Sequence, residues 1–497
     1  MELQFQKTVL PGLQLVKREV RNLEETQELR IPDTMPDIGR CVGAWGQVLL
    51  RGKEWRSGSV HVSGGVQAWA LYVPEDGVGV QCMQTWIPFH VKWDLPDTDE
   101  DGVIHIQCLL RSIDVRNSSS QKLVLRVNVG VLGEIWIPAQ SSLYIPENVP
   151  EDICLLRSKH AVLLPRESGE KAFTLEETLS PPTTGPIEKL LYYRLEPEVQ
   201  EKKILSDKVV FRGTAQLHML YQGTDGQLHS WDAEVPFSQY SELEREYSPG
   251  VALRIIPAVT GLELETTTEG GINLRAEITG QYMICQHMDL DVVEDAYSPQ
   301  RTVELHMERM QLPVMLEECQ QSLPAEQTVP QKGKTVDITF LQDHPYRMPG
   351  NEDVTLGIPG AFQFLSYDED GALQYTMARW EGQLQLPGED NAVLMTAVLP
   401  ADKSQSAFDG SGMLLSTNIQ IDAMPVCMVG IPMASGLELG EITPADPGRP
   451  SLILRRAGED SLWDLAKKTG STVERIREVN KLDTEPAPEQ MLLIPVL

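Results

Sequence analysis

Hydrophobic and polar residues alternate along most of this chain, so that every second position is apolar. In the first third the alternation covers residues 44–50, 59–72, 79–91, 103–115 and 123–137. Gly, Pro and Asp separate these runs, which is typical of antiparallel strands joined by turns. Residues 16–29 have a mixed pattern that fits a strand or a short helix. The alternation therefore predicts a mainly β fold.

An apolar strand that runs into an Asp-Gly pair occurs three times. The three glycines are Gly77, Gly226 and Gly371, which are 149 and 145 residues apart. Glycine supplies the positive φ that a tight hairpin turn needs. Such nearly equal spacing predicts an antiparallel, sandwich-like β domain that is used three times.

Two further correspondences support the repeat. Residues 87–89 read Ile-Pro-Phe and residues 235–237 read Val-Pro-Phe, at similar distances beyond their turn glycines. The pair Leu274-Arg275 also follows Leu125-Arg126 by 149 residues. The third copy lacks the Pro-Phe pair, so we expect it to be the most diverged.

Stretches rich in proline and polar residues predict linkers between the repeats. These stretches are residues 165–186, 299–334 and 443–450. The predicted division is three β domains and a small last domain, at 1–164, 187–298, 312–440 and 451–497. A chain of 497 residues is long enough for that number of domains.

The pattern changes after residue 450 to strand, helix, helix, strand. Ser461 and Asp464 form a capping box that opens a first helix, which Gly470 ends. Residues 471–474 predict a second capping box, and the helix that follows ends at Asn480. Its inward residues are expected to be Val473, Ile476 and Val479. Residues 452–455 and 491–495 read as the flanking strands.

Residues 458–466, 472–476 and 480 and the closing Leu493-Ile494-Pro495 resemble the LysM domain. One departure is Glu489, where that family usually has glycine. The resemblance implies a shallow groove for N-acetylglucosamine polymers, formed here by residues 458–462 and 488–491.

The chain is strongly acidic, with 72 Asp and Glu against 42 Lys and Arg and a formal net charge of −30. Such a surface repels nucleic-acid phosphates and anionic bilayers, so we expect neither as a partner. The first residues lack an apolar core of a secretory signal, and no apolar stretch is long enough to span a membrane. The seven cysteines are scattered and include no CxxC pair, which favours reduced thiols.

Three weak motifs favour structure over chemistry. Residues 97–102 begin like a calcium loop, but position twelve is Cys108 where a bidentate Glu is needed. Residues 333–335 read Gly-Lys-Thr, but the first glycine of a phosphate-binding loop is replaced by Thr328. Cys285 and His287 have no second pair of metal ligands nearby. We therefore predict no cofactor, no metal and no catalytic residue, although a catalytic dyad assembled from distant residues stays open.

The Ile-Pro-Asp and Pro-Asp-Ile segments at 31–33 and 36–38, the Asp-Gly hairpin and the Pro-Phe return resemble the SPOCS domain of spore-coat proteins. Together with a terminal LysM domain, the resemblance implies a non-enzymatic scaffold in endospore coat assembly. It implies a location in the mother-cell cytoplasm at the forespore surface. It also implies that LysM docks onto the coat morphogenetic ATPase, while the β domains contact other coat proteins or a second copy.

The residues expected to carry this docking all lie in the last domain. They are Gly458, Asp460, Ser461, Leu462, Trp463, Asp464, Leu465, Glu474, Arg475, Ile476 and Asn480. An alternative is that Leu462, Trp463 and Ile476 only build a small core. The alternative function is a peptidoglycan-binding protein that acts through LysM.

Overall fold

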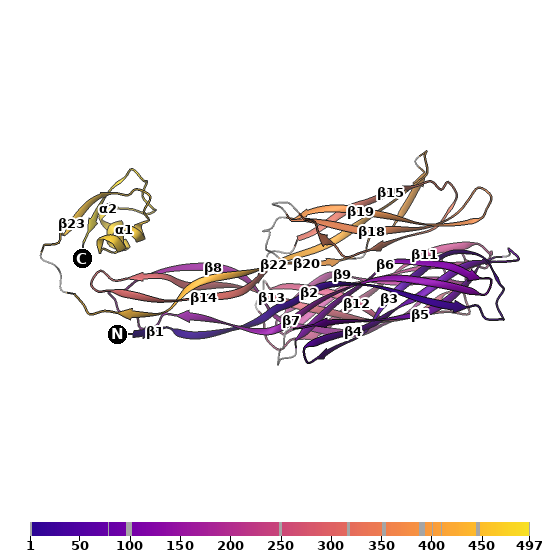
Figure 1. Ribbon diagram of the computed structural model, residues 1–497, viewed down its shortest axis with the longest axis horizontal. Helices are drawn as coiled ribbons and strands as arrows, with labels where there is room; N and C mark the ends of the chain where they lie inside the picture. The colour runs from indigo at the N-terminus through magenta and orange to yellow at the C-terminus, as the bar shows by residue number, and fades with distance from the viewer. Residues whose placement is uncertain are drawn as a thin grey trace.

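The computed structural model describes residues 2–77, 79–95, 102–247, 251–315, 319–349, 354–386, 393–399, 401–408, 410–443 and 448–496. Residues 97–101 of the calcium-like loop and 444–447 of the last predicted linker lie outside the described residues. The described residues form almost entirely antiparallel strands, with two short helices near the C-terminus (Figure 1). The predicted fold class is thus confirmed.

Three consecutive segments repeat one order of strands: a long strand, a three-stranded meander, a further strand and a long return strand. The first contains β1 (Glu2–Gln4), β2 (Gln6–Arg30), β3 (Ile38–Arg56), β4 (Ser59–Pro74), β5 (Gln81–Asp94), β6 (Val103–Ser119) and β7 (Lys122–Ile145). The second contains β8 (Cys154–Leu179), β9 (Ile187–Leu205), β10 (Lys208–Gly223), β11 (Leu228–Glu242), β12 (Ala252–Thr266) and β13 (Ile272–Tyr297). The third contains β14 (Val303–Met315), β15 (Cys319–Val329), β16 (Thr335–Gln342), β17 (Tyr346–Arg347), β18 (Val354–Tyr367), β19 (Leu373–Leu386), β20 (Val393–Val398), β21 (Gln405–Phe408) and β22 (Met413–Leu439).

Each repeat forms two antiparallel sheets. In the first repeat the sheets have the orders β3-β4-β5 and β2-β7-β6, and in the second they have the orders β9-β10-β11 and β8-β13-β12. The third repeat keeps the plan, but three of its strands are each divided in two. One of these is the first strand of the meander, where β16 and β17 both pair with β18. Both β14 and β15 pair with β22 on one side, and β20 and β21 pair with it on the other.

The three Asp-Gly turns have the same geometry. Gly77, Gly226 and Gly371 have φ values of 72°, 74° and 81°, and the space beside each Cα is open. Their amides donate to the carbonyl oxygens of Pro74, Gly223 and Asp368 at 3.0, 2.9 and 3.1 Å. The turns therefore connect the second and third strands of each meander, as predicted.

The Pro-Phe return also has a structural reason in the two repeats that contain it. Phe89 packs on Gly64 of the neighbouring strand, and Phe237 packs on Gly213. A Cβ on Gly64 would lie 2.5 Å from the Phe89 ring, and one on Gly213 would lie 3.0 Å from the Phe237 ring. The Phe89 ring needs glycine beneath it. At Gly213 the closer constraint is the carbonyl oxygen of Glu198, which a Cβ would meet at 1.8 Å.

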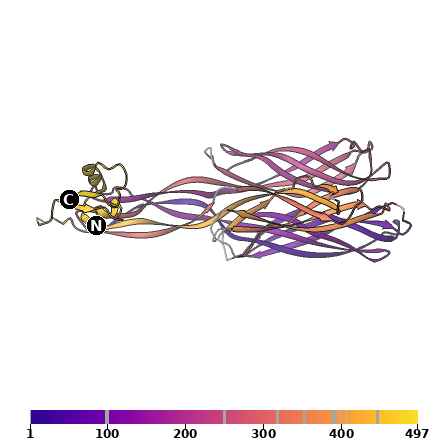
Figure 2. The same ribbon diagram turned by 90° about the horizontal axis from the view of Figure 1, so that it is seen from above.

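The long strands extend beyond the body of the molecule and form a stalk (Figures 1 and 2). We define the stalk as three two-stranded ribbons, one from each repeat, formed by residues 6–15 with 136–145, 154–164 with 286–297, and 303–315 with 426–439. An isolated ribbon is at best marginally stable. Here apolar residues of all three repeats share one core, which includes Leu10, Val162, Leu290, Met310 and Ile431.

Two of the predicted linkers were wrong. Residues 165–179 continue strand β8, and residues 303–315 and 319–329 form β14 and β15. These segments lie along the edges of their sheets, where one side of the backbone is unpaired and proline is tolerated. Polar composition there reflects a half-exposed edge strand. The four-domain division itself stays a proposal.

A buried ion pair joins the three repeats inside the body. Glu134 of β7 is 1% exposed and Arg254 of β12 is 2% exposed, with their closest N and O atoms 2.5 Å apart. Arg18 of β2 lies 3.4 Å from the same carboxylate and donates to the hydroxyl of Thr396 in β20 at 2.8 Å. Burial raises the pKa of Glu134, but the positive charges of Arg254 and Arg18 lower it by a larger amount. The net shift of this pKa is therefore downward.

A second buried cluster links the second and third repeats. His218 of β10 contacts Asp232 of β11 at 2.5 Å and Asp337 of β16 at 2.9 Å. Asp337 is 2% exposed. Burial lowers the pKa of His218, but the two carboxylates more than offset this and raise it to about 9. The imidazole is therefore protonated at neutral pH.

The His218 cluster predicts a loss of stability in alkali. A folded pKa of about 9 lies above the ordinary value of 6.5, so the stabilisation is complete below pH 6.5 and is lost as the pH rises through 9. It amounts to about 3 kcal/mol. The urea concentration at the midpoint of unfolding of the wild type should therefore decrease when the pH is raised from 6 to 9.5.

His218→Gln should lower that midpoint at pH 6 and flatten its dependence on pH in this range. His229→Gln is the matched control, because it removes a contact of 3.0 Å with Asp225 at an exposed turn. The control should keep the wild-type slope. A wild-type midpoint that does not change from pH 6 to pH 9.5 would contradict a raised pKa for His218.

Candidate functional site

The C-terminal module has the predicted order of elements. Strands β23 (Leu452–Arg456) and β24 (Met491–Pro495) form an antiparallel pair, and α1 (Leu462–Thr469) and α2 (Val473–Asn480) lie between them in sequence. Leu462, Leu465 and Ile476 are fully buried between helices and strands. The predicted strand-helix-helix-strand fold is confirmed.

The helix ends of the module follow from its sequence. The Ser461 hydroxyl accepts from the amide of Asp464 at 3.1 Å, and the Asp464 carboxylate accepts from the amide of Ser461 at 3.3 Å. These two bonds form the predicted capping box. The bonds from Ser461 lower the pKa of the exposed Asp464 carboxyl. Gly470 ends α1 with a φ of 66°, as predicted.

The second helix differs from prediction in two details. Its N-cap is Thr472, whose hydroxyl accepts from the amide of Arg475, so the predicted box beginning at Ser471 was wrong by one residue. Val479 was expected to face inward but is 45% exposed. The short helix has room for one fully buried side chain, and Ile476 takes that place.

The module packs against the tip of the stalk at the end of β13 (Figure 1). Tyr297, the last residue of β13, is 5% exposed and lies in the apolar core of the module. Its hydroxyl donates to the carbonyl oxygen of Ser471 at 3.0 Å. Its ring packs edge-on against that of Trp463, with the ring centroids 4.7 Å apart. Burial raises the pKa of this hydroxyl, so it stays a donor.

Asp295 provides the polar interactions between the stalk and the module. Its carboxylate accepts from the indole N–H of Trp463 at 2.8 Å. The Lys467 ammonium lies one helical turn further along α1 and donates to both carboxylate oxygens of Asp295, at 2.8 and 2.7 Å. The half-buried Trp463 is thus fully engaged within the chain.

The two loops that LysM domains place around their groove are tied together here. The amide of Gly458 donates to the carbonyl oxygen of Pro488 at 2.9 Å, and that of Ala457 donates to Gln490 at the same distance. The Glu485 carboxylate accepts from the amide of Leu462 at 3.0 Å. That carboxylate satisfies one of the free amides at the start of α1.

The residues predicted to bind a partner fall into three groups. Leu462, Leu465 and Ile476 lie in the core, which fits the alternative that they build it. Trp463 contacts the stalk, and Asn480 joins α2 to β24 through bonds of 2.6 and 2.8 Å with the backbone of Leu493. The exposed members are Gly458, Ser461, Asp464, Glu474 and Arg475, and Asp460 is half-buried between Arg455 and Lys468. The binding role of the set stays a prediction.

Sequence reasoning missed Asp295 and Tyr297. They lie 168 and 174 residues before their hydrogen-bond partners in the module, and their local sequence is that of an ordinary strand end. No motif connects them to the LysM sequence. Their role depends on where β13 ends in space.

The described residues include no group of three or more His, Cys, Asp or Glu side chains suited to hold a metal ion. Cys285, whose spacing to His287 resembles that of a metal ligand, is buried with its sulfur 2.9 Å from that of Met315. Among the described helices, none has the length and apolar character needed to cross a membrane.

Comparison with known families agrees with this geometry. Residues 186–266, which cover β9 to β12 of the second repeat, match the family SipL, SPOCS domain, and residues 458–495 match the LysM domain. Neither a curated protein nor a solved structure matches the chain.

The chain is therefore a β-rich protein with a SPOCS domain and a C-terminal LysM domain, as the sequence predicted. Both families are non-catalytic binding domains, and the two matches together support a sporulation-related protein. The SPOCS match suggests association with the spore coat.

The contact between stalk and module predicts that the module loses stability when the contacting side chains of the stalk are removed. Tyr297→Ala should cost about 3 kcal/mol, because a buried aromatic ring and its hydrogen bond are lost. Asp295→Asn should also weaken the contact, because it removes the negative charge between Trp463 and Lys467. Hydrogen exchange of residues 462–469 should accelerate in both variants of the full chain.

Asp291→Asn is the matched control on the same strand. Its carboxylate is 44% exposed and pairs with Arg157 at 3.3 Å, away from the module. Exchange in α1 should stay at the wild-type rate in this control. Unchanged exchange in Tyr297→Ala would show that the module does not depend on the stalk.

Proposed function

We propose that this chain is a non-enzymatic scaffold in endospore coat assembly, located in the mother cell at the forespore surface. In this proposal the LysM module docks onto the coat morphogenetic ATPase, and the β repeats contact other coat proteins or a second copy. The observation that carries the proposal is the position of the module at the tip of a stalk, beyond the body of the three repeats (Figure 1). Such a position lets a partner reach the module without meeting the body.

Charge supports a protein partner that presents basic groups to the body. The formal net charge of the chain is −30, and such a field attracts cationic surfaces and speeds their association. On the module itself charges of both signs are exposed, including Glu474 and Arg475 of α2. Exposed charges of both signs select a partner by complementarity more than by raw affinity.

Removal of the module tests the docking. A chain without residues 450–497 should no longer retain the purified ATPase in a pull-down. In the full chain Arg475→Glu should weaken retention about tenfold, because a like charge placed opposite a complementary patch costs one or more kcal/mol. Retention that is unaffected by the deletion would refute the proposal.

Arg477→Glu serves as the control for charge alone. Arg477 is exposed on the same helix, lies two residues further along and pairs with Glu485 at 3.7 Å. Because residues two apart point to different sides of a helix, this variant should bind as the wild type does. Equal losses in Arg475→Glu and Arg477→Glu would indicate a non-specific effect of charge.

The rival function is peptidoglycan binding through the LysM groove. Exposed Gly458, Ser461 and Met491 at the groove loops favour it, together with the family of the module. Co-sedimentation of the full chain with purified peptidoglycan separates the two functions. Saturable retention that is lost on deletion of residues 450–497 would favour the rival, and absence of retention would favour docking onto protein.

A further inference from the structure

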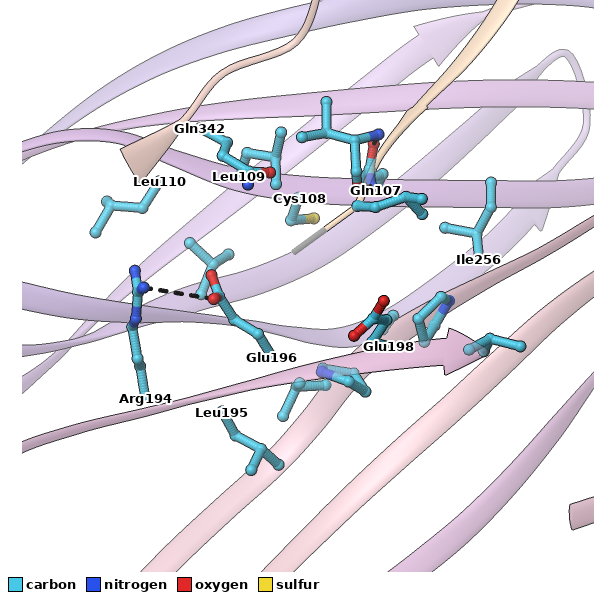
Figure 3. A pocket seen from close by; sticks show the side chains of 18 of the residues that line it. Gln107, Cys108, Leu109, Leu110, Arg194, Leu195, Glu196, Glu198, Ile256 and Gln342 are labelled. Carbon is cyan, nitrogen blue, oxygen red and sulfur yellow. Dashed lines mark hydrogen bonds and ion pairs between the residues drawn. The ribbon is translucent and has the colours of Figure 1, made fainter. Parts of the chain in front are cut away.

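A cavity of about 440 Å³ lies where the three repeats meet, and the residues that line it include none from the LysM module (Figure 3). Its walls come from β3 and β6 of the first repeat, β9 and β12 of the second, and β15, β16, β20 and β22 of the third. A volume of this size is typical of pockets for small organic ligands. Neither the SPOCS match nor the LysM match explains it.

One part of the wall is apolar. Residues of this part include Val48, Leu50, Leu110, Ile256, Val259 and Phe340. They come from all three repeats, so the apolar surface exists only when the repeats are assembled. It fits an aliphatic group, which gains about 25 cal/mol for each Å² removed from water.

Another part of the wall carries charge, mostly from β9. In Figure 3 the carboxylates of Glu196 and Glu198 point from β9 toward the strand that carries Gln107 and Cys108. Glu196 pairs with Arg194 at 3.4 Å, and Lys202 pairs with Asp422 at 4.0 Å. Each cation that lines the cavity is thus matched by a carboxylate.

Glu198 remains without such a partner. Within the described part of the chain its half-buried carboxylate has neither a hydrogen bond nor an ion pair. A carboxylate accepts hydrogen bonds only, so a ligand that donates to Glu198 is favoured at this part of the wall.

We propose that this cavity binds an alkylammonium group, with its aliphatic stem on the apolar wall and its ammonium beside Glu198. The cation would give the carboxylate its missing partner through a charge-assisted hydrogen bond. The negative field of the whole chain raises the local concentration of such cations. The same chemistry occurs in free polyamines and in the lysine side chain of a partner protein.

Calorimetric titration of the full chain tests the proposal with n-hexylammonium as the probe. Hexylammonium should bind and hexanoate should not, since the two share a stem of similar length and differ in the sign of the charge. Glu198→Gln should weaken the binding of hexylammonium at least about tenfold, the value expected for loss of one charge-assisted hydrogen bond. Raising the salt concentration should weaken it as well.

Glu201→Gln is the matched control, because Glu201 lies on the same strand but its side chain is exposed and does not line the cavity. It should bind the probe as the wild type does. The thermal unfolding midpoint of both variants should equal that of the wild type, which separates lost binding from lost folding. Titrations with spermidine and with a short lysine-containing peptide then distinguish the two sources of the cation by which of them binds more tightly.

Three results would overturn the proposal. The first is the absence of binding by every ammonium probe, and the second is equal binding of hexylammonium and hexanoate. The third is an equal loss in Glu198→Gln and Glu201→Gln. None of these results bears on LysM docking, which is measured with a different part of the chain.

Discussion

The architecture depends on how the sheet edges are satisfied where the three repeats meet. An edge strand presents unpaired amides and carbonyls, and burial of these groups without partners is costly. Here long side chains of neighbouring repeats supply the partners. The fully buried Gln281 of the second repeat bonds both the amide and the carbonyl of Ile106 in β6, at 2.9 and 2.8 Å. Gln107 of the first repeat does the same for Val398 in β20, at 3.3 and 2.7 Å.

Other edges are closed in the same way, so no repeat supplies all its own partners. Gln47 accepts from the amide of Leu195 at 2.9 Å, Gln363 donates to the carbonyl of Ala44 at 2.9 Å, and Arg194 donates to that of Phe340 at 3.1 Å. The buried pair of Glu134 and Arg254 adds a charged link at the same junction. The repeats consequently form one body, and the apolar cavity walls and the shared core of the stalk both depend on that assembly.

This arrangement also relates the LysM module to the rest of the chain. A module of this size has a small core and gains from additional burial. The stalk supplies it through Tyr297, while Asp295 fixes the orientation of Trp463. The face of α1 that carries Trp463 is thereby used inside the chain, and the exposed residues on α2 and the groove loops remain for a partner. The module is thus an end piece of the stalk as much as a separate binding domain.

Sequence patterns with a local cause were sufficient for much of the fold. Alternation predicted the strands, the Asp-Gly pairs predicted three turns with positive φ, and Ser461 with Asp464 predicted the start of α1, because each depends on a few adjacent residues. The SPOCS and LysM domains could be recognised for the same reason. Edge strands were mistaken for linkers, since an edge strand and a linker share polar residues and prolines.

Tertiary structure alone decided what lies between the repeats and between stalk and module. Asp295 and Tyr297 meet the LysM core from about 170 residues away, and Glu198 reaches a cavity whose wall belongs to three repeats. The residues next to these positions in the sequence do not predict their roles. Each role depends on a contact between side chains that come together only when the chain folds. The sequence by itself determined the repeated units and the identity of the last module, whose rules are local. The junction between the repeats, the stalk and the docked module depend on packing between residues far apart in the sequence, which no local rule predicts.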